Sequence, residues 1–149
     1  MTTDPIVADL LARARAAQAL YAKFNQAEVD DVVAAIAWVV LEPGRNQHLS
    51  ERAVEDTGLG DIDDKFKKNH RKTLGLLRDL TGAPSVGVIA TDSERGLIEI
   101  ARPIGVVGAI TPSTNPVATP TNKVMNALKG GNAIILAPSP RGEAVVRSW

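Results

Sequence analysis

The stretch that decides the fold is Ile104-Gly-Val-Val-Gly-Ala-Ile110, which a loop and a helical segment connect to Ala133-Ile-Ile-Leu136. Both apolar runs have the length of a strand and lack alternation, which is typical of strands buried on both faces of a parallel sheet. Between them, Val117 to Leu128 has helical periodicity and ends before Gly130-Gly131. We therefore predict a βαβ unit with parallel strands at about 104–110 and 132–137 and a right-handed crossover.

Upstream of this unit, two short runs have the composition of a β-hairpin. They are Val86-Gly-Val-Ile-Ala90 and Leu97-Ile-Glu-Ile100, and the polar turn Thr91-Asp-Ser-Glu-Arg-Gly96 separates them. Runs rich in β-branched residues on either side of a polar turn that ends in glycine favour antiparallel pairing. The sequence predicts a hairpin over 85–100.

The first part of the chain, residues 1–81, has the pattern of four helices. Capping residues and proline or glycine breaks mark their ends. We predict helices from Pro5 after Asp4, from Asn25 (with Glu28 as capping-box partner) to Pro43-Gly44, from Gln47 to Thr57 before Gly58, and from Asp61 to Leu80, with a break allowed at Gly75. The fold class is therefore α/β: helices over 1–81, a hairpin over 85–100 and the start of a parallel sheet over 104–149.

Composition excludes several classes of protein. The chain has 149 residues, with 17 Lys and Arg against 17 Asp and Glu, so its formal net charge is zero. A balanced charge gives no indication of a protein that binds nucleic acid or an anionic membrane. No apolar run is long enough to span a bilayer and the start lacks the features of a signal peptide, so we expect a cytoplasmic protein. Without cysteine, and with only His48 and His70, we expect no metal site and no thiol nucleophile in this chain.

The loop Thr111-Pro-Ser-Thr-Asn-Pro116 is the best candidate for a functional site. It follows the first parallel strand, and ligands of open α/β sheets bind at the carboxyl ends of strands. Thr114 and Asn115 could donate hydrogen bonds to a developing oxyanion. The alternative is a proline-bounded turn in which Thr114 or Asn115 caps the following helix.

A second candidate, Pro138-Ser139-Pro140-Arg141, follows the second parallel strand. Ser139 could meet a cofactor ribose and Arg141 a phosphate, or Ser139 could be an N-cap with Pro140 at the first helical position. No Gly-x-Gly-x-x-Gly follows the strand. The charged run 63–72 is interpreted as a solvated helix face, and His70 has no carboxylate partner to make it a general base.

Two segments resemble the aldehyde dehydrogenase superfamily: Pro103-Ile-Gly-Val-Val-Gly-Ala-Ile-Thr-Pro-Ser-Thr-Asn-Pro116 and Asn126-Ala-Leu-Lys-Gly-Gly-Asn-Ala-Ile-Ile-Leu-Ala-Pro-Ser-Pro-Arg141. Together with Glu55-Asp-Thr-Gly-Leu-Gly60 and Asp92-Ser-Glu-Arg-Gly96 they are most similar to the coenzyme-A-acylating members, such as acetaldehyde and sulfoacetaldehyde dehydrogenases. The resemblance implies a Rossmann-like domain that binds NAD(P) without the usual glycine loop. It also implies attack of a cysteine thiolate on a small aldehyde, hydride transfer to the nicotinamide, and transfer of the thioester to water or coenzyme A.

Carried over to this chain, the resemblance implies an oxyanion donor at Asn115, or at Thr114 when the loop is counted without a gap. It implies cofactor contacts from Thr111, Pro112, Ser139 and Arg141. Ala137 stands where ordinary members have a lysine that meets the adenosine ribose, which favours NAD over NADP. The hairpin is expected to project and to help subunits form a homo-oligomer.

The organisation of the chain is that of an incomplete fold. Two parallel strands cannot bury two apolar faces without neighbours. We expect the N-terminal portion of a longer oxidoreductase whose nucleophilic cysteine, catalytic glutamate and catalytic domain lie elsewhere. The alternative is a non-catalytic nucleotide-binding or interaction module.

Overall fold

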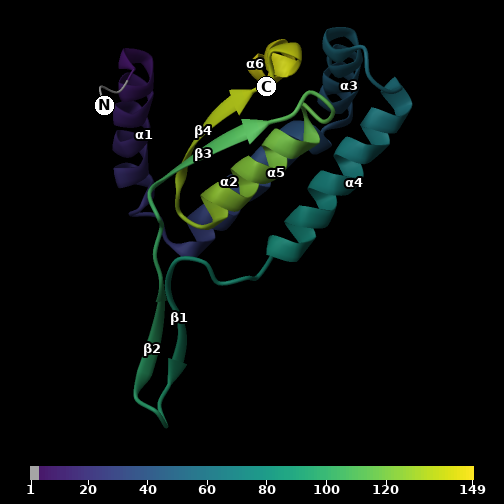
Figure 1. Cartoon of the computed structure of the whole chain (residues 1–149). Helices are drawn as coiled ribbons and strands as arrows, with labels where there is room; N and C mark the ends of the chain where they lie inside the picture. Colours follow the sequence, from purple (N-terminus) through teal and green to yellow (C-terminus); the bar gives the residue numbers. More distant parts are fainter. Residues whose placement is uncertain (1–3) are drawn as a thin grey trace.

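The structure is a computed structural model that describes residues 4–149 (Figure 1). Its elements follow the predicted order of helices, hairpin and βαβ unit. They are α1 (Pro5–Tyr21), α2 (Gln26–Leu41), α3 (Pro43–Thr57), α4 (Ile62–Leu80), β1 (Gly87–Asp92), β2 (Leu97–Ala101), β3 (Val106–Thr111), α5 (Ala118–Lys129), β4 (Ala133–Pro138), η1 (Pro140–Gly142) and α6 (Glu143–Arg147).

The parallel pair β3–β4 confirms the predicted βαβ unit. Its register runs from Val106 opposite Ala133 to Thr111 opposite Pro138. The first strand begins later than predicted because Gly105 has φ +114, outside the range of a strand, and its N–H bonds the side chain of Asn132 at 3.0 Å. The two strands are therefore aligned so that their carboxyl ends meet.

Helices pack mainly on one side of these strands. α5 contacts both β3 and β4, and α2 and α4 pack in turn against α5. α1 lies on the other side of the strands (Figure 1). Met125 of α5 and Val33 and Ala37 of α2 are buried together. Ile110 of β3 remains 83% exposed where no helix of residues 4–149 covers it, as expected of two parallel strands that lack further neighbours.

The start of α3 differs from the prediction. Pro43 begins α3 instead of ending α2: Glu42 caps the new helix by accepting hydrogen bonds from the N–H groups of Gly44 and Arg45 at 2.9 and 2.6 Å. Proline suits a first helical position because it needs no N–H partner there. α4 runs through Gly75 without a break.

The hairpin of β1 and β2 extends away from the rest of the chain, as predicted (Figure 1). Four large apolar side chains of the hairpin are exposed close together, and apolar patches of this kind often mark an interaction surface. They are Val88, Leu97, Ile98 and Ile100, at 61%, 56%, 62% and 51% exposure. Over residues 4–149, none of the helices has the length and apolar character needed to cross a membrane.

Candidate functional site

The carboxyl ends of β3 and β4 form the edge at which we predicted cofactor contacts. The N–H of Ser139 donates to the carbonyl of Thr111 at 3.0 Å, which joins the two strand ends. Pro112 directly follows β3, and Arg141 lies in the short helix η1 after β4; both are exposed. The fold therefore brings the four predicted cofactor residues to one edge of the sheet.

Polar groups at this edge lack hydrogen-bond partners within residues 4–149. Thr111 is 2% exposed, and its Oγ1 is buried without a hydrogen bond within residues 4–149. Ser139 occupies the N-cap position of η1, but its side chain makes no capping bond. A buried hydroxyl without a partner costs free energy. This edge therefore offers hydroxyl groups that a bound ligand could satisfy.

The loop between β3 and α5 holds Thr114 and Asn115. Neither side chain caps α5, whose N-cap is Val117 with no side-chain hydrogen bond, so the capping alternative is wrong. Thr114 is exposed, whereas Asn115 is half-buried. The Oδ1 atom of Asn115 is buried and has no partner within residues 4–149. The Oδ1 atom of Asn115 therefore takes no part in maintaining the loop within residues 4–149.

Lys65 of α4 reaches this loop from the side. It is 5% exposed, and its Nζ donates to the carbonyl of Thr114 at 3.5 Å. Burial, and then the positive charge of Lys68, lowers the pKa of Lys65. Through this hydrogen bond, Lys65 links α4 to the β3–α5 loop at Thr114, the residue before Asn115.

Asn115 also lines a cavity of about 330 Å³ between α4 and α5, here called the α4–α5 groove. The loop supplies Asn115, α4 supplies two lysines, and α5 supplies small and polar side chains and a third lysine. The lining residues are Lys68, Lys72, Asn115, Ala118, Thr119, Asn122, Lys123 and Asn126. The groove gives the candidate oxyanion donor a strongly basic surrounding.

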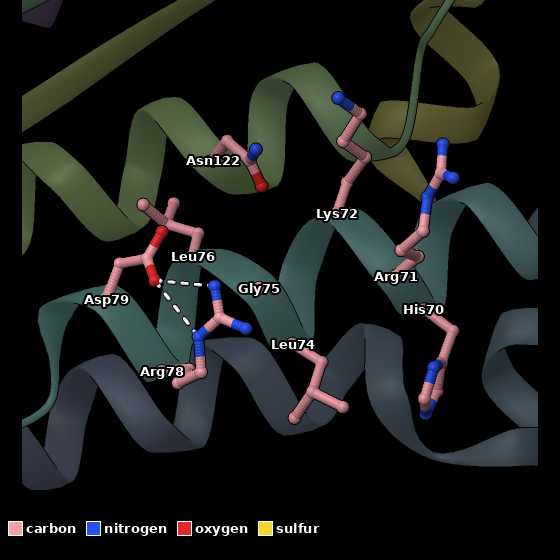
Figure 2. A pocket seen from close by; sticks show the side chains of 9 residues that line it. All are labelled: His70, Arg71, Lys72, Leu74, Gly75, Leu76, Arg78, Asp79 and Asn122. Atoms are coloured by element: carbon pink, nitrogen blue, oxygen red, sulfur yellow. Dashed lines mark hydrogen bonds and ion pairs between the residues drawn. The ribbon is translucent and has the colours of Figure 1, made fainter.

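A larger cavity of about 840 Å³ lies farther along α4 (Figure 2). It shares Lys72 and Asn122 with the α4–α5 groove, and Arg78 forms an ion pair with Asp79 at 2.9 Å along its wall. In Figure 2, His70 extends away from Asn122 on the other side of α4. Because none of the predicted site residues lines this cavity, we do not place the site there.

The interpretation of residues 63–72 as a solvated helix face is wrong in part. Lys65 and Asn69 are buried, at 5% and 2% exposure. Asn69 donates hydrogen bonds to Asn46 at 3.1 Å and to Ser50 at 3.2 Å, which join α4 to α3. Lys65, Asn69 and the buried Thr73 recur every fourth position, so one face of α4 is buried although it is polar.

Sequence comparisons relate this chain to known enzymes. A family model described as aldehyde dehydrogenase family matches residues 2–147. A sulfoacetaldehyde dehydrogenase (acylating) from Cupriavidus necator is 66% identical over 137 residues, which are 92% of this chain and 28% of that protein. This chain therefore spans less than a third of the length of that relative.

Comparisons with solved structures point to the same family of enzymes as the sequence comparisons. An acetylating aldehyde dehydrogenase from Geobacillus thermoglucosidasius matches with a TM-score of 0.90 and 35% identity, over 95% of this chain and 31% of that one. An engineered glycolyl-CoA reductase with bound NADP+ matches with a TM-score of 0.77 and 28% identity, over 91% and 30% of the two chains. The described fold thus corresponds to part of a larger enzyme in each case.

Proposed function

The chain belongs to the aldehyde dehydrogenase family, and on this basis we propose that the full-length protein oxidises an aldehyde with a nicotinamide cofactor and transfers the acyl group to coenzyme A. The identity with an acylating sulfoacetaldehyde dehydrogenase is the observation that carries the proposal. The solved acetylating relative, whose fold this chain shares, supports it. Sulfoacetaldehyde is therefore the first substrate to test.

We assign stabilisation of the oxyanion to Asn115, with Thr114 as the alternative. When a thiolate adds to an aldehyde carbon, negative charge develops on the carbonyl oxygen and needs fixed hydrogen-bond donors. The half-buried position of Asn115 and its place in the α4–α5 groove support this role, in which the Nδ2–H of Asn115 would donate to the oxyanion. Thr114 is exposed, and its carbonyl is engaged by Lys65.

We place the nicotinamide cofactor at the carboxyl edge of β3 and β4, with contacts from Thr111, Pro112, Ser139 and Arg141. When bound, the cofactor accepts the hydride from the substrate. The partnerless Oγ1 of Thr111 and the uncapped hydroxyl of Ser139 fit a ligand rich in hydroxyl and amide groups. Ala137 offers no charge to a 2′-phosphate, so we favour NAD over NADP.

The 149-residue chain by itself should not turn over aldehydes. The family's reaction begins with a cysteine thiolate, and this chain contains no cysteine. A serine would need an adjacent base, and neither His48 nor His70 lies beside a serine in a hydrogen bond within residues 4–149. We therefore propose that the nucleophile comes from a part of the full-length protein outside these 149 residues.

The proposal is tested with purified full-length protein, sulfoacetaldehyde, NAD and coenzyme A. We expect NADH formation by absorbance and a sulfoacetyl-CoA product by mass spectrometry, and no product from the 149-residue chain. Omission of coenzyme A should abolish the thioester. NADH formation without any thioester would contradict acyl transfer, and the absence of NADH with every aldehyde would contradict the whole proposal.

A further inference from the structure

The α4–α5 groove gathers positive charge that no ion pair within the described part of the chain neutralises. Lys68, Lys72 and Lys123 line it, and no carboxylate does. Figure 2 shows Lys72 reaching from α4 toward α5, on the side where Asn122 faces it. The ion pairs formed within residues 4–149 involve none of these three lysines. The groove therefore has an excess of positive charge.

Such a cluster favours an anion for two physical reasons. Like charges held near one another repel, and an anion bound among them relieves that repulsion. Uncharged donors add direction: the hydroxyl of Thr119 and the side-chain amide of Asn122 share the groove. Ammonium groups beside a hydroxyl and an amide are the donors that sulfonate or carboxylate oxygens accept from.

The position of the groove relates this anion site to the reaction. Asn115, the residue assigned to the oxyanion, lines the same groove. An aldehyde whose carbonyl oxygen is held by Asn115 would therefore find the lysines beside the rest of the molecule. The cavity volume of about 330 Å³ is at the low end of the roughly 300–1,000 Å³ of ligand pockets, which suits a short substrate.

We propose that Lys68, Lys72 and Lys123 select aldehydes that carry a sulfonate or carboxylate at the end remote from the carbonyl. The proposal rests on the aldehyde oxidation proposed above. It assigns substrate selection to α4 and α5, which are separated in sequence by the hairpin and β3. The lysines act by attracting and holding the anionic end, while the carbonyl chemistry stays with the oxyanion donor and the nucleophile.

The test compares anionic and uncharged aldehydes in the full-length enzyme. Lys72→Met, Lys123→Met and the double variant are assayed with sulfoacetaldehyde, succinate semialdehyde and butyraldehyde, at saturating NAD and coenzyme A. We expect the ratio of kcat/KM for each anionic aldehyde over butyraldehyde to fall by roughly tenfold or more per lysine, through KM, as expected for loss of a charge-assisted contact. Lys67→Met is the matched control: Lys67 lies on α4, is exposed and does not line the groove, so the ratio should not change.

The remaining outcomes distinguish this inference from the proposed function. Lys72→Arg and Lys123→Arg, which keep the charge, should retain most of the selectivity, and added salt should raise KM for the anionic aldehydes alone. If wild type oxidises all three aldehydes and the lysine variants keep its selectivity ratio, the inference is wrong while the proposed function stands. A higher KM for coenzyme A with an unchanged ratio would assign the lysines to its phosphates and also overturn the inference. An enzyme without turnover on any aldehyde would remove both proposals.

Discussion

Gly142 packs so closely against Pro116 that a Cβ built on Gly142 would lie 2.8 Å from the Cβ of Pro116. Both residues are buried, and Pro116 directly follows Asn115. We expect Gly142→Ala to destabilise the protein by about 1–3 kcal/mol, the usual cost of overpacking. Because the loop must move to relieve the clash, kcat/KM for the aldehyde should also fall, as measured by NADH formation in the full-length enzyme.

Gly75→Ala is the matched control for that substitution. Gly75 lies inside α4, and an added Cβ would have no neighbour within 4 Å. Alanine in a helix interior should stabilise by about 0.5–1 kcal/mol relative to glycine, without a loss of activity. Equal melting temperatures for wild type and Gly142→Ala would show that the contact between Gly142 and Pro116 does not constrain the loop.

Substitution of Asn115 and Thr114 separates the two oxyanion candidates. In the full-length enzyme, Asn115→Ala should lower kcat by roughly 100-fold or more, the cost of losing one oxyanion donor. Thr114→Ala should change kcat by less, because the Lys65 contact uses the backbone carbonyl, which alanine keeps. NADH affinity should persist in both variants. A large loss in Thr114→Ala with normal turnover in Asn115→Ala would reverse the assignment.

The cofactor assignment predicts weaker NADH binding when the end of β4 is altered. Ser139→Ala removes the hydroxyl that makes no capping bond, and Arg141→Ala removes an exposed charge in η1. Fluorescence titration of the full-length protein with NADH should show a Kd raised by several-fold in each variant, about 1 kcal/mol for a lost hydrogen bond. Glu143→Ala, on the following helix, is the control. Unchanged affinity in both variants would remove this strand end from the site.

The exposed hairpin predicts that the full-length protein associates through β1 and β2. The apolar side chains of Val88, Ile98 and Ile100 are more than half exposed and would be buried by a partner subunit. Ile98→Glu should shift the protein to smaller species in size-exclusion chromatography with light scattering, because an unpaired charge resists burial. Glu94→Lys, in the hairpin turn, should leave the mass unchanged. A monomeric wild-type protein would contradict this role.

Local rules of the sequence accounted for most of the fold. Asn25 and Glu28 form the predicted capping box, and Gly58 ends α3 with φ +64. The error at Pro43 has a clear cause, since proline suits both the end of one helix and the first position of the next. The carboxylate of Glu42 decides between them, because it accepts hydrogen bonds from the N–H groups of Gly44 and Arg45 and so caps α3.

The candidate site was predictable only where topology constrains it. Thr111 and Ser139 could be placed at one edge because the carboxyl ends of parallel strands meet. The lysines of the α4–α5 groove could not be predicted to lie together. Nothing in the run 63–72 indicates which helix α4 packs against. The burial of Lys65 likewise depends on its contact with the loop at Thr114, far away in the sequence.

The buried position of Lys65 predicts a dependence of stability on pH. Burial, and then the charge of Lys68, lowers the pKa of Lys65 in the folded protein from its ordinary value of 10.5. The unfolded chain therefore binds more protons than the folded one between the two pKa values, and stability should rise with pH across that interval. In the full-length protein, the melting temperature of wild type minus that of Lys65→Met should increase as pH rises toward 10.5. Lys67→Met, at an exposed position on the same helix, is the control for the loss of a lysine from α4. If the difference in melting temperature between wild type and Lys65→Met stays flat or falls as pH rises, burial does not disfavour the charged form of Lys65.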